Sequence, residues 1–258
     1  MLSREAMFIG LTCSAGSRPM HYAILDEKLN IQALDAGDLE NVLAVIAGLR
    51  APVVAVGAPQ RPSQGVMARP EIRRRFNLNP ESPIWTQWRL CEYELRRRNI
   101  RIPRTPAEVE KAPRWMQNGF DVYVRLQKMG LGALVPDASV EPFTFLEVQS
   151  HACYTVLLER RPYLKRTLEG RLQRQLVLHL EGLDLRNPMQ ILSGITRQHF
   201  LQSSLPMGDL HSVEGLDCLI NAYTAYLVSA KPARIRHVGD PKEGLISVPT
   251  MQLKNFYV

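Results

Sequence analysis

Three acidic residues lie beside apolar segments, which is the setting of many catalytic carboxylates. Glu147 follows the largely apolar stretch 143–146 near the predicted end of a strand. Glu214 and Asp217 are three residues apart, so on a helix both project from one face. Carboxylate oxygens are the ligands that Mg²⁺ and Mn²⁺ prefer, and such ions activate water for phosphodiester cleavage. The pattern predicts Glu147 and Asp217 as metal ligands, Glu214 as a ligand or general base, and His211 as an aid to proton transfer.

The same carboxylates have a structural alternative. In that interpretation Glu147 pairs with an arginine, Glu214 lies at the solvent boundary, and Asp217 makes a polar contact between packed helices. Spacing alone favours the structural alternative.

The positive charge of the chain is concentrated in one segment. Between Arg61 and Arg114 there are thirteen Lys and Arg against six Asp and Glu, and this surplus of seven equals the net charge of the whole chain. A cluster of this kind can neutralise phosphates and attract a polyanion. The arginines that we predict to contact nucleic acid are Arg73, Arg74, Arg75, Arg89, Arg96, Arg97 and Arg98.

Tryptophans and a tyrosine interleave with these arginines. Trp85, Trp88, Tyr93 and Trp115 could stack on bases, although tryptophan more often fills a core. The alternative for the arginines is a solvated helical face whose side-chain stems cover apolar surface. For any single arginine the solvated helical face is the favoured interpretation, whereas for the cluster as a whole binding of nucleic acid is favoured.

The first sixty residues have an ordered strand and helix pattern. Apolar runs predict strands at 7–13, 20–25 and 29–34, and a helix starts at Asp38 with apolar residues at helical spacing up to Leu49. The β-branched run 53–56 predicts a fully buried fourth strand. Because a helix separates the third and fourth strands, we expect the fourth to be parallel to another strand of the sheet.

The remaining chain divides into an insertion and a helical half. Residues 60–142 hold nine of the eighteen prolines and predict a basic, mostly helical insertion within one domain that spans 1–258. A fifth strand is predicted at 143–148, followed by helices at 151–159, 168–180, 188–201 and 211–230. The turn-rich segment 239–244 predicts a closing hairpin. The fold class is therefore α/β, with a mixed five-stranded sheet and flanking helices.

Several other classes of protein have little support. The four cysteines form no CxxC pair, which argues against a disulfide scaffold, and the six histidines form no HExxH zinc motif. A P-loop lysine is missing, and no apolar run approaches the length of a membrane span or of a signal peptide core. We expect a cytoplasmic protein with no membrane association.

Short motifs along nearly the whole chain resemble one family. These are FIGL at 8–11, VAVGAP at 54–59, RLCEYELR at 89–96, FLEV at 145–148, EGLDC at 214–218 and the turn around GD and EG at 239–244. In this order they resemble the predicted nucleases catalogued as domain of unknown function 429. The resemblance implies a ribonuclease H-like fold, in which acids on the first and fourth strands and on a late helix hold divalent metal ions.

Two positions depart from that family pattern. Thr12 and Gly57 stand where the first and fourth strands of the family carry aspartates. Because carboxylate charge dominates the affinity of these sites for divalent cations, the loss of two acids should weaken metal binding strongly.

Three hypotheses about function follow. The first is a nuclease-like protein that is catalytically degenerate and binds nucleic acid without efficient hydrolysis. The second is an active hydrolase that uses Glu147, Glu214 and Asp217 with Mg²⁺ or Mn²⁺ as cofactor. The third is a non-enzymatic structural or partner-binding module. Only the second requires a metal.

Overall fold

The strands of the computed structural model form one mixed sheet across the described residues, which are 6–16, 18–79, 81–82, 84–136, 140–205 and 207–258. This part of the chain contributes eight strands to the sheet, in the order β3-β2-β1-β4-β6-β8-β7, with β5 also paired to β6. The strands are β1 (Met7–Thr12), β2 (Met20–Leu25), β3 (Ile31–Gly37), β4 (Pro52–Val56), β5 (Gly132–Ala133), β6 (Thr144–Val148), β7 (Arg236–Asp240) and β8 (Gly244–Val248).

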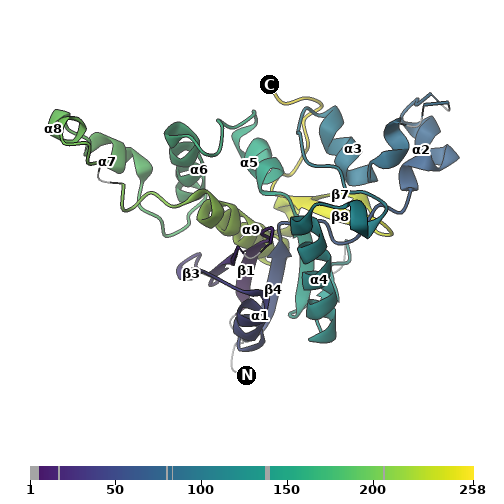
Figure 1. The fold of residues 1–258 in the computed structure, drawn as a ribbon, viewed down its shortest axis with the longest axis horizontal. Coiled ribbons are helices and arrows are strands. Elements are labelled where there is room, and N and C mark those ends of the chain that lie inside the picture. The colour runs from purple at the N-terminus through teal and green to yellow at the C-terminus, as the bar shows by residue number, and fades with distance from the viewer. Residues whose placement is uncertain (1–5, 17, 80, 83, 137–139, 206) are drawn as a thin grey trace.

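Helices cover both faces of the sheet (Figure 1). The α-helices are α1 (Leu39–Ala47), α2 (Pro70–Arg75), α3 (Leu90–Arg97), α4 (Arg114–Lys128), α5 (Ser150–Leu158), α6 (Leu168–Leu180), α7 (Pro188–Ser193), α8 (Arg197–Leu201) and α9 (Val213–Ala230). Short 3₁₀ helices lie at η1 (Val66–Ala68), η2 (Ile84–Gln87), η3 (Val109–Lys111) and η4 (Pro232–Arg234).

The sheet topology follows from short turns and crossovers. Strands β1, β2 and β3 are antiparallel neighbours, whereas β4 pairs parallel with β1, as the sequence predicted, and β6 pairs parallel with β4. The predicted sheet of five strands, with a separate closing hairpin, is smaller than the observed sheet. The hairpin β7–β8 joins the sheet because β8 pairs with β6, and the two-residue strand β5 pairs with β6 as well.

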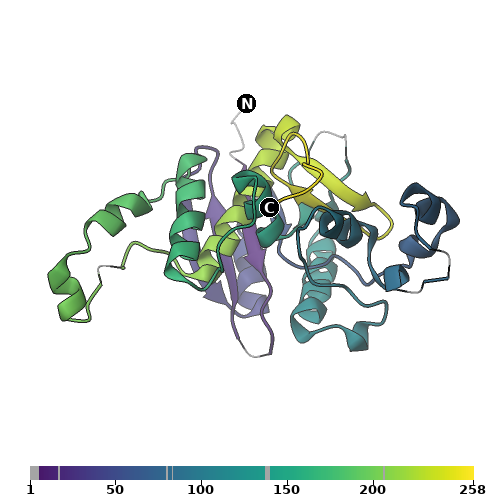
Figure 2. The same ribbon diagram turned by 90° about the horizontal axis from the view of Figure 1, so that it is seen from above.

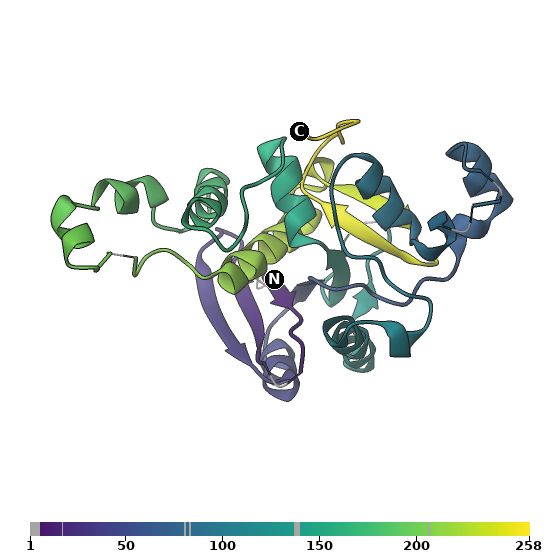
Figure 3. The same ribbon diagram turned by 45° about the horizontal axis from the view of Figure 1, so that its top comes forward.

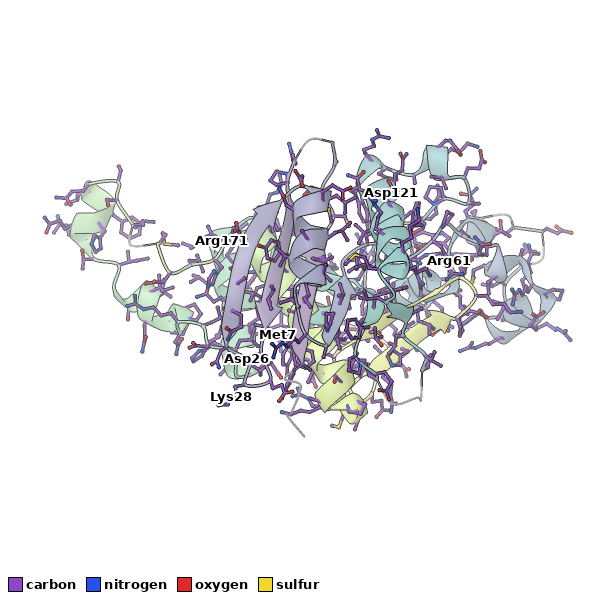
Figure 4. The ribbon with its side chains drawn as sticks, turned by 90° about the horizontal axis from the view of Figure 1, so that it is seen from below. Met7, Asp26, Lys28, Arg61, Asp121 and Arg171 are labelled. Carbon is purple, nitrogen blue, oxygen red and sulfur yellow. The ribbon has the colours of Figure 1, made fainter. Side chains whose placement is uncertain are left out.

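Alternation along the buried strands builds a separate apolar core on each face. In β4, Val53 and Ala55 belong to the core under α5, α6 and α9, whereas Val54 and Val56 belong to the core under α1 and α4. Figure 3 shows α9 lying along the first face, and Figure 4 shows α1 and α4 side by side on the opposite face, with Asp121 on α4 and Met7 at the start of β1. Gly10 permits the close approach of α9, because a Cβ there would lie 2.0 Å from the carbonyl oxygen of Cys218.

Two segments extend from opposite ends of the molecule (Figure 2). At one end, α7 and α8 replace the single helix predicted at 188–201. At the other end lie residues 66–98, which we call the arginine-rich lobe; α2 lies at its tip, and α3 joins it to the body. About half of the described residues of the predicted insertion lie in helices, so the prediction of a mostly helical segment is too high. Two of its helices pack on the body, since α3 contacts β7 and residues of α4 fill a core on one face of the sheet. No helix of the described chain combines the length and the apolar character that a membrane span requires.

Candidate functional site

A cavity of about 530 Å³ lies where the parallel strands end. Thr12 is the last residue of β1, Gly57 comes directly after β4, and Gln149 comes directly after β6. Because these strands are parallel, their carboxyl ends meet at one edge of the sheet, where ligands of open α/β sheets bind. We call this cavity the strand-end cleft.

The wall of the strand-end cleft comes from helices and loops that are distant in sequence. It includes four cationic and two acidic side chains, which are Arg101, Arg161, Lys165, Arg174, Glu214 and Asp217. Two aromatic side chains, Trp115 and Tyr163, also border it, together with His151 at the start of α5. The cleft is therefore a polar site with an excess of positive charge.

Neutral groups occupy the floor of the cleft, where the resemblance implies carboxylates. The Asn221 amide donates from Nδ2 to the carbonyl oxygen of Leu11 at 2.9 Å and accepts from Ser150 Oγ at 3.1 Å. A Cβ on Gly57 would lie 2.7 Å from Asn221 Nδ2, so the amide fills the space of a side chain at position 57. Thr12 Oγ1 lies 3.5 Å from Cys218 Sγ.

Glu147 does not line the strand-end cleft with Asp217, and instead borders a separate small cavity of about 50 Å³. Its side chain is 1% exposed and pairs with Arg89, with 2.5 Å between Arg89 Nη2 and Glu147 Oε1 and 2.9 Å between Arg89 Nη1 and Glu147 Oε2. The backbone N–H of Gln60 donates to Oε2 as well. The structural alternative for Glu147, an arginine partner, is thus the one observed, and the residue is not placed to share a metal ion with Asp217.

Arg89 is the centre of a buried acidic cluster and not a surface ligand for nucleic acid. Besides Glu147 it pairs with Glu92, 2.8 Å from Arg89 Nε, and Nη1 lies 3.5 Å from the carbonyl oxygen of Glu243. The Glu243 carboxylate accepts the N–H of Leu90 and the Ser63 hydroxyl. Burial alone would lower the pKa of Arg89, but Glu147 and Glu92 raise it above its usual value. The cluster joins β6, α3 and the β7–β8 hairpin.

The two acids on α9 do border the cleft. Asp217 Oδ2 lies 3.2 Å from Lys165 Nζ, and burial raises the pKa of Asp217 although Lys165 acts in the opposite direction. Glu214 lies in the first turn of α9 and is exposed. His211 precedes α9 and does not line the cleft, and burial lowers its pKa. Among the residues with defined positions, no group of three His, Cys, Asp or Glu side chains is arranged to hold a metal ion.

The other predicted nucleic-acid ligands belong to the arginine-rich lobe. Arg75 and Arg97 lie 4.9 and 5.0 Å from the centre of the Phe76 ring, and Arg96 lies 4.9 Å from that of Trp88. Arg98 donates to the carbonyl oxygen of Glu94.

These contacts place the guanidinium groups of three arginines over an aromatic cluster. Trp85 and Trp88 pack against the small core of this lobe, as the structural interpretation of the tryptophans requires. Arg74 and Arg96 are exposed, and Arg73 is half-buried.

Three cations of the cleft act on His151 at the start of α5. The pKa of His151 is lowered to about 4 by burial, and by the nearby charges of Arg174, Arg161 and Lys165. These cations come from α6 and from the segment that precedes it.

Sequence reasoning missed the cleft cations Arg161, Lys165 and Arg174, and it placed Arg101 only within the basic segment 61–114. The pairs Arg160-Arg161 and Lys165-Arg166 on either side of Pro162 were a weak local signal for such a site. Arg174 lies within a predicted helix and gives no signal of its own, because its place in the cleft depends on the chain folding around it.

Comparisons with protein-family models, with curated proteins and with solved structures find no match to this chain.

Proposed function

We propose that this chain is a nuclease-like protein of the ribonuclease H-like superfamily whose catalytic centre is degenerate, and that it binds nucleic acid without hydrolysing it. The arrangement of the strands supports the superfamily. The first and fourth strands are neighbours, so Thr12 and Gly57 stand at adjacent strand ends, where the resemblance implies the two catalytic acids.

The observation that carries the proposal is the neutral floor of the strand-end cleft. Thr12 offers one hydroxyl, Gly57 offers no side chain, and Asn221 fills the space that a side chain at position 57 would need. A Mg²⁺ or Mn²⁺ ion depends on several charged oxygen ligands. The donor set therefore does not fit a divalent metal, and we derive no catalytic step through one.

The active-hydrolase alternative has weaker support. It requires Glu147 as a ligand, yet both Glu147 oxygens accept hydrogen bonds within the buried Arg89 pair. Asp217 is paired with Lys165, and Glu214 is exposed. Freeing Glu147 would leave Arg89 buried without one of its two partners, which is a large energetic cost.

The positive excess of the cleft supports a polyanion as the ligand. The cleft is lined by four cationic side chains and only two carboxylates. The exposed arginines of the arginine-rich lobe offer further positive charge for a long polyanion. Neutralising phosphates releases counterions, so affinity should fall steeply as salt is raised.

The test measures binding and cleavage together. Fluorescence anisotropy with labelled single- and double-stranded DNA and RNA is followed from 50 to 300 mM NaCl, and cleavage is assayed with 5 mM Mn²⁺. We expect salt-dependent binding and no cleavage. Lys165→Ala should weaken binding several-fold and reduce the salt slope by about one, whereas the control Lys128→Ala, at the far end of α4, should do neither.

Two results would overturn the proposal. Mn²⁺-dependent cleavage that Asp217→Ala abolishes would establish the active alternative. Absence of binding to every polyanion would favour the structural module.

A further inference from the structure

We propose that the strand-end cleft binds a terminal phosphate monoester, carried by a nucleotide or by the end of a nucleic acid strand, and that Arg174 is the cation that anchors it. The nucleotide identity of the ligand rests on the function proposed above, whereas the phosphate site rests on the geometry of the cleft alone.

Arg174 is held in place before any ligand arrives. It lies on α6 with 3% of its surface exposed, and its Nη1 donates to the carbonyl oxygens of Gly170 at 2.8 Å and Tyr163 at 3.0 Å. Its guanidinium also lies 5.3 Å from the centre of the Tyr154 ring. A cation fixed in this way loses little conformational entropy when it binds an anion.

The positive charge of Arg174 has no carboxylate partner within the described chain. None of the ion pairs formed by those residues includes Arg174. Asp217 acts on it at longer range, but the Asp217 carboxylate pairs with Lys165 instead. A buried charge without a partner is costly, so a guanidinium that lines a cavity in this state is best explained by an anion that enters the cavity.

The start of α5 supplies a second, independent set of donors to the same cavity. Gln149 is the N-cap residue of this nine-residue helix, and its side chain makes no capping hydrogen bond. Gln149, Ser150 and His151 all line the cleft. The free N–H groups and the positive end of the helix dipole favour a phosphate at this position.

Charge and size indicate which phosphate the site would take. The wall has two more cationic than acidic side chains, and a phosphate monoester carries about −1.5 to −2 at pH 7, whereas an internal phosphodiester carries only one negative charge. The volume of about 530 Å³ falls within the range of small-ligand sites. Trp115 and Tyr163, the latter 62% exposed, border the cleft as surfaces on which a base can stack.

The experiment compares twelve-residue single-stranded oligonucleotides that differ only at their ends: a 5′-phosphate, a 3′-phosphate, or hydroxyl groups at both ends. Adenosine monophosphate and inorganic phosphate are titrated in parallel by calorimetry. We expect at least one terminal phosphate to improve the affinity of the wild type tenfold or more. Binding of the free monophosphate as tight as that of the oligonucleotide would identify the mononucleotide as the ligand.

Matched variants assign the effect to Arg174. Arg174→Met keeps an unbranched apolar stem without the charged guanidinium group and should abolish the gain from the terminal phosphate, whereas Arg174→Lys should keep part of it and Lys128→Ala all of it. A gain that survives in Arg174→Met, or equal affinity for phosphorylated and hydroxyl ends in the wild type, overturns the inference.

The two proposals fail separately. Salt-dependent binding with no preference for a terminal phosphate removes the phosphate site but keeps the proposed function. If inorganic phosphate binds and this binding depends on Arg174, but no oligonucleotide binds, the phosphate site is kept and the proposed function is removed. If Arg174→Met does not fold, NMR decides on the wild type: inorganic phosphate must shift the ring resonances of His151, and no shift contradicts the site.

Discussion

Two buried arginines of this protein have opposite electrostatic surroundings. Arg89, 1% exposed, pairs with Glu92 and Glu147, and the carboxylates raise its pKa. Arg174, 3% exposed, donates only to carbonyl oxygens among the described residues, and burial lowers its pKa. The first charge is paired with carboxylates within the protein, whereas the second has no paired carboxylate among the described residues and feels Asp217 only at longer range.

The difference separates structural from binding roles in a chain rich in arginine. A compensated arginine joins segments that are far apart in sequence, since Glu147 is 58 residues from Arg89. An uncompensated arginine at a cavity wall reduces the stability of the unliganded protein and favours a ligand of opposite charge. Burial alone would not have distinguished the two.

The largest expected effect is on the stability of the Arg89 cluster. Arg89→Met leaves two carboxylates buried without a cation, so the free energy of unfolding should fall by about 3–5 kcal/mol. Arg174→Met removes hydrogen bonds worth about 1 kcal/mol each, but also removes an uncompensated charge, so its net effect should lie within about 1 kcal/mol. Urea unfolding of both variants at pH 7 measures the contrast.

The paired variant Arg89→Met/Glu147→Gln is the control for that contrast. Removing the charge of Glu147, one of the two carboxylates left without a cation, should recover part of the lost stability, because part of the penalty comes from that charge. If Arg89→Met and Arg174→Met lower the free energy of unfolding equally, the two arginines do not differ in the way proposed.

The second expected effect concerns the pKa of His151, which burial and the positive charges of the cleft lower. Burial, together with Arg174, Arg161 and Lys165, lowers its pKa from 6.5 to about 4. The unfolded chain therefore binds the proton at higher pH than the folded protein does. The stability contributed by the neutral ring is complete above pH 6.5 and is lost as the pH falls towards 4, by up to about 3 kcal/mol.

Unfolding of the wild type and of His151→Gln across pH 4–7 tests this linkage, and we expect a flatter profile in the variant. An NMR titration should also find the His151 pKa raised in Arg174→Met, since a neighbouring positive charge has been removed. A pKa near 6.5 in the wild type would show that the cleft lacks the proposed positive field.

The sequence anticipated the regular elements better than the site. Strand β4 was predictable because its β-branched residues are buried on both sides, and α6 was predictable from its apolar spacing. Strand β5 was not, because two residues carry no periodic pattern. Asp217, predicted as a metal ligand, borders the cleft beside Lys165, whereas the burial of Glu147 by Arg89 and of Arg174 by the chain before α6 depends on contacts between distant segments, which no local pattern records.

The smallest expected effect tests the neutral floor that separates the cleft from a metal site. In Gly57→Ala the new Cβ would lie 2.7 Å from Asn221 Nδ2 and 3.0 Å from the carbonyl oxygen of Leu11, so we expect a loss of about 1–3 kcal/mol. Asn221→Ala should cost a similar amount, because it removes two buried hydrogen bonds, one to the carbonyl oxygen of Leu11 and one from the Ser150 hydroxyl. In the double variant the first clash is absent, so the loss should be smaller than the sum by about 1 kcal/mol.

Gly132→Ala is the matched control, because a Cβ there meets no atom within 4 Å, and it should change the unfolding free energy by less than about 0.5 kcal/mol. Additive losses in the double variant would mean that Asn221 does not occupy the side-chain space of position 57. In that case an acid introduced by Gly57→Asp would have room beside Thr12, and the floor of the cleft would be one substitution away from a metal ligand. A coupling of the expected size means instead that Asn221 must change together with Gly57 before a carboxylate fits.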